Sequence, residues 1–96
     1  MNKNVRTVAD FRAAHDPNVI VPAKIKNALA AMLKEHAEMW EYEGDFIRRA
    51  QVSQTQIGQF REQFASHVVE TPSTSKHSTR RVWFADPKVA KSVREA

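Results

Sequence analysis

The sequence contains no cysteine and only two glycines, Gly44 and Gly58. Without cysteine it can form neither a disulfide bond nor a thiolate zinc site, which excludes zinc fingers. With so little glycine it has no phosphate-cradling loop and no Gly-x-Ser-x-Gly motif, and its four histidines lack the spacing of a metal site. Glu43 and Asp45 are interpreted as helix-end residues rather than as a catalytic carboxylate pair. We therefore expect no metal, no cofactor and no enzymatic activity.

Long hydrophobic runs are also absent. No stretch approaches the roughly 18 consecutive apolar residues that would indicate a membrane-spanning helix. Residues 1–10 lack the apolar segment of a signal peptide. Hydrophobic residues make up 42% of the chain and charged residues 27%, values typical of a globular rather than a disordered protein. We expect one soluble, cytoplasmic domain spanning residues 1–96, with no membrane partner.

The charge is unevenly distributed along the chain. Residues 1–43 carry six basic and six acidic groups, so this part is neutral. Residues 71–96 carry six basic groups against two acidic ones, an excess that accounts for the whole net charge of +4. A basic C-terminal part after a neutral first part suggests a polyanionic partner, although an ordinary solvated basic surface would have the same composition.

Capping signals predict a short helix near the N-terminus. Thr7 can cap its start, because Asp10 follows three residues later in a capping-box arrangement. The Asp-Pro pair at residues 16–17 should end this helix, since a residue before proline avoids the helical region. We therefore expect a helix over residues 8–14, followed by a short apolar linker or edge strand at residues 19–21.

A longer helix is predicted over residues 22–40. Pro22 is favoured at a first helical position, and apolar residues then recur at three- and four-residue steps as far as Trp40. His36 lies on this apolar face, and we expect it to pack in the core rather than to bind a metal. The acidic run that ends at Gly44 should break the helix.

Two shorter helices follow. Asp45 is expected to cap the first of them. The second has two start signals, because Ser53 and Gln56 form a capping box while Val52 and Ile57 occupy the positions of a hydrophobic staple. The two signals agree on a helix over residues 53–66.

The pattern becomes extended after these helices. Alternating residues predict strands at 67–70 and 81–84, joined by a polar loop at 71–79. Asp86 and Pro87 are then typical of the cap and first residue of a helix. The apolar residues of this helix, which we expect to face inward, are Val89, Ala90 and Val93. The domain therefore divides into an N-terminal helix and linker (1–21), a helical core (22–70), a hairpin (67–85) and a C-terminal helix (86–96).

Residues 46–61, with the sequence FIRRAQVSQTQIGQFR, resemble the helix-turn-helix of bacterial and bacteriophage DNA-binding proteins. Two helices joined by a tight turn share a small core, which requires apolar side chains at five fixed positions. Those positions hold Phe46, Ala50, Val52, Ile57 and Phe60. Gln51 takes the place of the usual turn glycine, where a positive φ is expected, and Ile47 takes the place of the usual alanine. The motif at residues 45–66 and the hairpin that follows are similar to the winged variant of the family.

The resemblance implies a mainly α-helical winged helix-turn-helix fold with a small β hairpin. It also implies double-stranded DNA as the partner, with the N-terminal residues of helix 53–66 at base edges in the major groove. Gly58 costs about 1 kcal/mol of helix stability relative to alanine, which suggests that DNA or a packed side chain approaches it closely. The implied contacts on this helix and beside it are Ser53, Gln54, Thr55, Gln56, Gly58, Gln59, Arg61, Gln63 and Arg48. The implied contacts in the wing are Lys76, His77, Arg80 and Arg81.

Three functions fit this resemblance. The first is a phage or bacterial transcription regulator that binds as a homodimer, with the helices at residues 8–14 and 87–94 available for pairing. The second is the DNA-recognition subunit of a phage packaging complex, of the small-terminase type, which would form a higher oligomer. The third is a winged-helix adaptor or inhibitor that docks on another protein through Trp40 or Trp83, since aromatic residues dominate protein interfaces.

Overall fold

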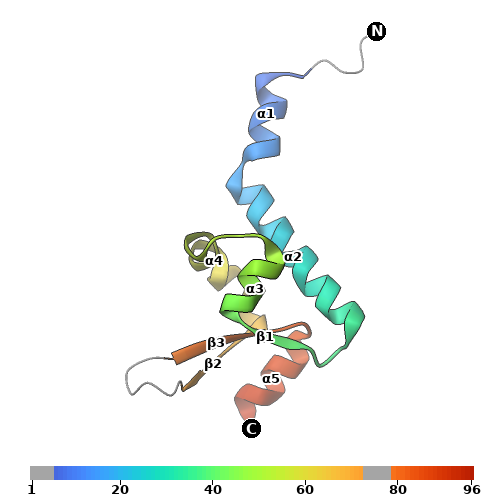
Figure 1. The fold of residues 1–96 in the computed structure, drawn as a ribbon, viewed down its shortest axis with the longest axis vertical. Helices are drawn as coiled ribbons and strands as arrows, with labels where there is room; N and C mark the ends of the chain where they lie inside the picture. Colours follow the sequence, from blue (N-terminus) through green and yellow to red (C-terminus); the bar gives the residue numbers. More distant parts are fainter. Residues whose placement is uncertain (1–5, 73–78) are drawn as a thin grey trace.

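The computed structural model describes residues 6–72 and 79–96. In chain order these residues form helix α1 (Val8–His15), helix α2 (Pro17–Glu35), strand β1 (Trp40–Tyr42), helix α3 (Glu43–Ala50), helix α4 (Gln54–Phe60), 3₁₀ helix η1 (Arg61–His67), strand β2 (Val68–Pro72), strand β3 (Thr79–Phe84) and helix α5 (Pro87–Glu95). Figure 1 shows α1 extending away from the body that the other elements form. The described part is mainly helical with a small antiparallel sheet, and the predicted class is confirmed at that level.

The first helix forms as predicted, whereas the second begins earlier than predicted. Thr7 Oγ1 accepts a hydrogen bond from the Asp10 amide, and the Asp10 carboxylate accepts one from the Thr7 amide, so the predicted capping box is confirmed. Asp16 ends α1 and also caps α2, whose first residue is Pro17. The linker or edge strand predicted at residues 19–21 is wrong, because the helix that starts at Pro17 continues through these apolar residues into the core.

The predicted end of the long helix is also wrong. α2 ends at Glu35, and the chain turns before Trp40 begins β1. His36, which we expected in the core, is instead the exposed C-cap of α2. The apolar spacing runs past the helix end because Trp40 belongs to a strand, whose partner β3 lies far along the chain. The buried face of α2 consists of Val21, Pro22, Ile25, Ala28, Leu29 and Met32.

A tight turn joins α3 to α4, as the motif predicts. α3 begins at Glu43 after the N-cap Tyr42, so the expected cap at Asp45 is wrong, and Asp45 lies in the first helical turn instead. Gln51 has φ 59° and ψ 45°, which confirms the positive φ expected at the turn. The capping box predicted for the start of α4 is confirmed.

The helix predicted over residues 53–66 is not continuous. α4 ends at Phe60, and the chain tightens into η1, in which Phe64 has non-helical angles of φ −111° and ψ 23°. Phe64 is buried, and its ring centroid lies 6.4 Å from that of Trp83. A straight helix is thus replaced by a kinked one that packs Phe64 on the sheet, and Gln63 lies beyond the end of α4.

The three strands form an antiparallel sheet in the order β1-β3-β2. The predicted hairpin of β2 and β3 is confirmed, with Val68 opposite Trp83 and Val69 opposite Val82. Its strands are longer than predicted, because residues 71–72 and 79, which we expected in the loop, pair as strand residues. β1, which the sequence pattern did not predict, pairs with the other edge of β3. Since successive residues of a strand point to opposite faces, Trp83 packs in the helical core while Val82 and Phe84 pack on the other face.

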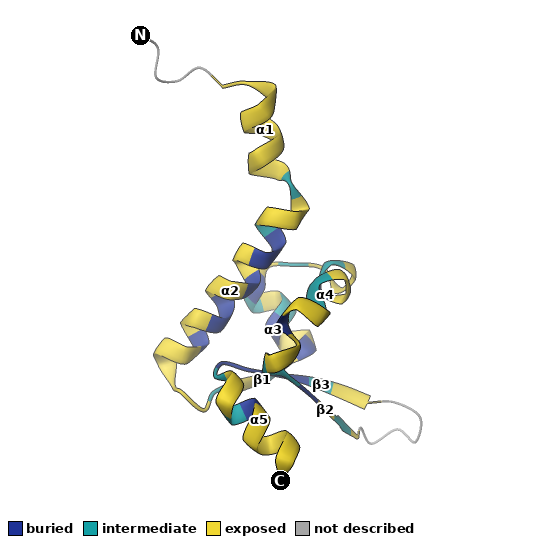
Figure 2. Ribbon diagram, turned by 180° about the vertical axis from the view of Figure 1, so that it is seen from behind, coloured by how far each residue is buried: buried dark blue, intermediate teal, exposed yellow. Residues whose placement is uncertain are grey.

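α5 covers this second face of the sheet. Asp86 caps the helix and Pro87 is its first residue, as predicted. Ala90 is buried and Val89 is half-buried, but Val93, which we expected to face inward, is 43% exposed at the edge of the sheet. Figure 2 shows that the buried residues gather where the helices meet one another and the sheet, whereas α1 is exposed along its length. The sheet therefore lies between α5 and the core of α2 to α4, with α1 outside both.

Candidate nucleic-acid interface

The outward face of α4 is polar and uncharged. Ile57 is buried and Phe60 is half-buried on the inner side, which leaves the opposite side toward solvent. No charged residue occurs in α4, and the next acidic residue, Glu62, lies in η1. This face offers hydrogen-bond donors and acceptors without a fixed charge, which suits contact with base edges. The exposed residues of α4 are Gln54, Thr55, Gly58 and Gln59.

Gly58 leaves the centre of this face open. A β-carbon placed on Gly58 would have no heavy atom within 4 Å among the described residues, apart from its chain neighbours and the backbone of its own helix. Of the two explanations considered for a glycine here, a packed side chain is therefore excluded within the described part of the chain. The other explanation, close approach of a bound molecule, is consistent with the open space.

Two of the predicted contact residues also hold the start of α4. Ser53 Oγ accepts a hydrogen bond from the Gln56 amide at 3.1 Å, and Gln56 Oε1 accepts one from the Ser53 amide at 2.9 Å. Gln56 is half-buried and its amide oxygen is engaged in the cap. The Ser53 hydroxyl retains a proton that it can donate to a ligand.

The carboxylate of Glu43 joins α4 to the rest of the domain. Its Oε1 accepts hydrogen bonds from Gln54 Nε2 at 2.8 Å and from Arg61 Nη2 at 2.6 Å. Its Oε2 accepts hydrogen bonds from Arg61 Nε at 3.0 Å and from Trp83 Nε1 at 3.1 Å. Glu43 is 7% exposed, and a carboxylate so buried is costly unless donors satisfy it, as these four do. One side chain in the first turn of α3 thereby connects α4, η1 and β3.

The surroundings of Glu43 keep it ionised. Burial alone would raise the pKa of this carboxyl, but the hydrogen bonds from Arg61, Trp83 and Gln54, with the positive charge of Arg61, bring its pKa below the ordinary value. The hydrogen bond to Glu43 in turn raises the pKa of the Arg61 guanidinium. Both partners are therefore charged. The Arg61 guanidinium binds Glu43 and does not extend toward a position where DNA would lie.

Two other basic residues lie at the turn that leads into α4. Arg48 Nη1 lies 2.9 Å from Asp45 Oδ1, but both side chains are more than half exposed, so this ion pair is weak and leaves Arg48 accessible. Lys24 Nζ donates a hydrogen bond to the Gln51 carbonyl at 3.2 Å. This contact places a positive charge beside the turn between α3 and α4.

The hairpin directs its two described arginines to opposite faces, because they are successive residues of β3. Arg81 lies on the face toward the helical core, with its Nε 3.5 Å from Glu70 Oε1. Arg80 lies on the α5 face, with its guanidinium carbon 4.6 Å from the centre of the Tyr42 ring. Although they point to opposite faces, both arginines line one hollow at the start of α3, together with Arg48 and the acidic residues Glu43 and Asp45.

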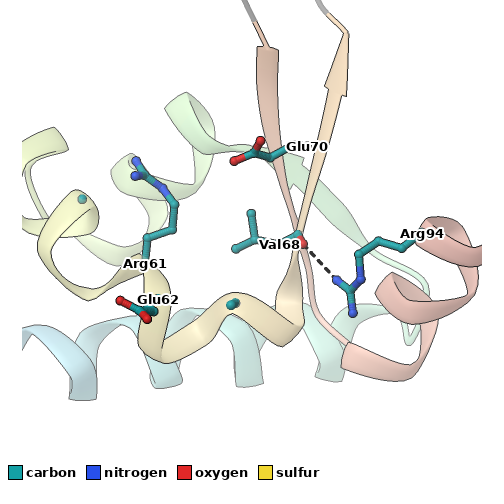
Figure 3. A pocket seen from close by; sticks show the side chains of 7 residues that line it. Arg61, Glu62, Val68, Glu70 and Arg94 are labelled. Atoms are coloured by element: carbon teal, nitrogen blue, oxygen red, sulfur yellow. Dashed lines mark hydrogen bonds between the residues drawn. The ribbon is translucent and has the colours of Figure 1, made fainter.

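A hollow lies between α4, η1 and β2, and Figure 3 shows it from close by. Glu62 and Glu70 line it together with Arg61. Arg94 reaches it from α5 and donates a hydrogen bond to the Val68 carbonyl at 2.9 Å. Because acidic and basic groups both line it, this hollow lacks the single sign of charge that a phosphate site would need.

The predicted contact residues fall into groups that differ in position and in the bonds of their side chains. Those that share the outward face of α4 are Gln54, Thr55, Gly58 and Gln59. Ser53, Gln56 and Arg61 have side chains that are bonded within the protein, and so does Gln54 of the outward face, which donates to Glu43. Arg48 is exposed on α3 and lines one hollow with Arg80 and Arg81, and Gln63 is exposed beyond the end of α4. Lys76 and His77 lie outside the described residues.

Two residues of this region, Glu43 and Lys24, were not predicted to belong to it. The sequence indicates only a helix-end role for Glu43, because its partners follow 11, 18 and 40 residues later and no local spacing relates them. Lys24 precedes Gln51 by 27 residues and meets it only through the packing of α2 against the turn. Both contacts depend on tertiary structure.

Among the described residues, no group of three or more His, Cys, Asp or Glu side chains could hold a metal ion. No helix within residues 6–72 or 79–96 has the length and apolar character needed to cross a membrane. Comparison of the chain with protein-family models, with curated proteins and with solved structures found no match.

Proposed function

We propose that this chain is a winged helix-turn-helix protein that binds double-stranded DNA with α4 in the major groove. The observation that carries the proposal is the outward face of α4, where Gln54, Thr55 and Gln59 are exposed and uncharged around the open position of Gly58. The major groove admits an α-helix, and in helix-turn-helix proteins the N-terminal residues of the recognition helix contact base edges. Gln54 and Thr55 are the first two residues of α4.

The order of the elements supports this fold assignment. A helix, a strand, two helices across a tight turn and a hairpin follow one another from α2 to β3 (Figure 1). Gln51 at the turn is left-handed, and Phe46, Ile57 and the half-buried Val52 share one core. In this arrangement α3 would cross the DNA backbone while α4 enters the groove.

The placement of charge also supports DNA as the partner. Lys24 and Arg48 lie at the turn that leads into α4, while the α4 face itself is uncharged. Cations at the edges of the groove would neutralise phosphates, and the uncharged centre would meet the bases. The net charge of +4 has the sign that phosphate binding requires.

As the biological role we propose a phage or bacterial transcription regulator that acts in the cytoplasm as a homodimer. α1 supports a dimer, because it has no buried residue and exposes Val8 by 66% and Phe11 by 63%. An eight-residue helix is too short to be stable alone in water, so a second copy packed on it would stabilise it. Sedimentation analysis should show that Phe11→Ser weakens the dimer, whereas Leu33→Ser, at another exposed apolar residue, should not.

A docking role on another protein is the second candidate. Trp83 is fully buried, but Trp40 is 47% exposed and meets Tyr42 edge-on, with ring centroids 5.2 Å apart. Together with Val93 they line an apolar groove between β1 and α5. An exposed tryptophan in such a groove favours a protein contact there. A packaging subunit of the small-terminase type would use the DNA surface proposed above and would differ by forming a higher oligomer.

A titration of mixed-sequence duplex DNA, followed by fluorescence anisotropy at several salt concentrations, tests the DNA proposal. The logarithm of the affinity should fall linearly with the logarithm of the salt concentration, with a slope that reports several phosphates. Lys24→Ala and Arg48→Ala should each reduce the slope by about 1. Lys91→Ala, on α5 across the sheet, is the matched control and should leave the slope unchanged. Absence of binding even at low salt would contradict DNA binding and favour the docking role.

A further inference from the structure

We propose that Gln54 reads the adenine of an A·T base pair and that Glu43 is the positioning residue that orients the Gln54 amide for this contact. The inference rests on the proposed DNA-binding function and adds the base that α4 recognises. It follows from the direction of the hydrogen bond between these two side chains.

The direction of this bond determines which end of the Gln54 amide faces outward. An ionised carboxylate accepts hydrogen bonds and cannot donate them. The Gln54 group that lies 2.8 Å from Glu43 Oε1 is therefore the amide nitrogen, and the carbonyl oxygen lies at the other end of the amide. The nitrogen also carries a second hydrogen. Because Gln54 is exposed, one acceptor and one donor are available to a ligand.

Glu43 is itself held in place, so it restricts the amide to one orientation. Arg61 binds both carboxylate oxygens, at 2.6 and 3.0 Å, and Trp83 Nε1 binds Oε2 at 3.1 Å. Trp83 is fully buried and stacks on Phe46 with ring centroids 4.5 Å apart. The positive charge of Arg61 also offsets the negative charge that Glu43 would otherwise direct toward a DNA phosphate. A side chain oriented in advance loses less entropy on binding.

A glutamine held in this way matches adenine and opposes guanine. In the major groove adenine offers the N7 acceptor beside the N6 amino donor, which pair with the N–H and the carbonyl oxygen of the amide. Guanine offers two acceptors, N7 and O6, so its O6 would face the Gln54 carbonyl oxygen. An amide turned by 180° would place its oxygen against N7 instead, so neither orientation suits the two acceptors of guanine. For adenine the turned amide would set donor against donor and acceptor against acceptor, and it would also place its oxygen against the Glu43 carboxylate. The bond to Glu43 thus keeps the amide in the orientation that matches adenine.

Gln59 provides a matched comparison on the same helix. It is exposed on the outward face of α4, as Gln54 is. Of the two glutamines, Gln54 is the one whose amide is hydrogen-bonded to a carboxylate within the described part of the chain. If Glu43 orients the glutamine that reads the base, the base preference should depend on Gln54 and not on Gln59.

Site selection from a random duplex pool, with the unmodified chain and with Gln54→Ala, tests the inference. Gln54→Ala should lose a base preference at one position, and the base preferred there by the unmodified chain should be adenine. On the selected site, replacing that adenine by guanine should weaken binding of the unmodified chain by about 5- to 150-fold. Gln54→Ala should bind both duplexes within about twofold of each other, while Gln59→Ala should keep the adenine preference.

Glu43→Gln tests the positioning role. An amide at position 43 can donate as well as accept, so the Gln54 amide would no longer be fixed, and the preference should weaken at that one base pair. A merely structural role would instead lower the affinity for all duplexes alike. The side-chain amide of Gln54 in the unmodified chain gives a second readout that does not depend on this variant folding. Its NH₂ protons should exchange with water more slowly than those of Gln59, and equal exchange would overturn the positioning role.

The outcomes separate the inference from the proposed function. If no duplex binds at any salt concentration, the proposed function fails and the inference fails with it. If duplexes bind with the expected salt dependence but Gln54→Ala changes no base preference, or changes a preference for a base other than adenine, the inference alone is overturned.

Discussion

Glu43 Oε1 lies 2.6 Å from Arg61 Nη2, and this ion pair connects the first turn of α3 to the first residue of η1. The side chains are 8% and 24% exposed, so water screens the pair only weakly. The turn and the whole of α4 lie between these two residues in the chain. The orientation of α4 relative to α3 and the sheet therefore depends on this contact.

Removal of the Glu43 carboxylate should destabilise the fold strongly. Glu43→Ala leaves Arg61 and Trp83 Nε1 without their acceptor, and loss of one partner from a buried pair typically lowers the free energy of unfolding by about 3–5 kcal/mol. Urea denaturation measures this change. Glu62→Ala, at an exposed glutamate in η1, should change it by less than about 0.5 kcal/mol. Equal effects of the two substitutions would contradict the role given to Glu43.

Acid should weaken the fold through the same residue. The pKa of Glu43 is lower in the folded chain than the ordinary value of 4.5, so the unfolded chain takes up a proton at a higher pH than the folded one. The stabilisation is therefore fully present above that ordinary value and is lost as the pH falls through the lower folded pKa. In urea unfolding from about pH 7 to about pH 3, the gap in stability between the unmodified chain and Glu43→Gln should shrink toward the acid end. A constant gap would show that ionisation of Glu43 does not stabilise the fold.

Gly58→Ala should strengthen the fold and weaken DNA binding. The added methyl group meets no described atom within 4 Å, and alanine favours a helix interior over glycine by about 1 kcal/mol. On DNA the same methyl group would obstruct close approach, and a loss of affinity on the order of tenfold is expected, equivalent to about 1.4 kcal/mol. Thermal unfolding and anisotropy titration measure the two effects.

Gly44→Ala is the matched control for this substitution. Gly44 lies in α3, and a β-carbon there also meets no described atom within 4 Å. Its affinity for DNA should be unchanged. If Gly58→Ala binds duplex DNA as well as Gly44→Ala does, α4 does not approach DNA at Gly58.

The two capping boxes should differ in their effect on stability. Ser53→Ala removes the cap of α4, which carries the buried Ile57, and should lower the free energy of unfolding by about 1 kcal/mol. Thr7→Ala removes an equivalent cap from α1, which has no buried residue, so the main unfolding transition should be unchanged. Urea denaturation of both variants decides the matter. An equal loss from Thr7→Ala would mean that α1 is part of the cooperative core.

The starts of α1, α4 and α5 were predictable because capping is local. Thr7, Ser53 and Asp86 each bond to a backbone amide two or three residues away, and these three predicted caps are confirmed. The starts of α2 and α3, the helix ends and β1 were not predictable in this way. Trp40 continues the apolar spacing of α2, and only its pairing with Phe84, forty-four residues later, makes it part of a strand.

The candidate site was likewise predictable only where neighbouring residues in the sequence determine it. The spacing of Ile57 and Phe60 and the cap at Ser53 were sufficient to identify the outward face of α4. The bonds that fix Gln54 and Arg61 were not predictable, because Glu43 meets them only after α3, α4 and η1 have packed together. A count of basic residues in the sequence therefore overstates how many can bind a ligand, because Arg61 binds Glu43 instead.

Chemical-shift mapping of the isotope-labelled chain, titrated with a duplex selected from a random pool, tests the central claim most directly. We predict that the largest shifts occur at the backbone amides of residues 53–59 and at the side-chain amide of Gln54, with small shifts at Trp40 and Val93. Shifts confined to the groove of Trp40, Tyr42 and Val93, with α4 unaffected, would contradict the placement of DNA on α4.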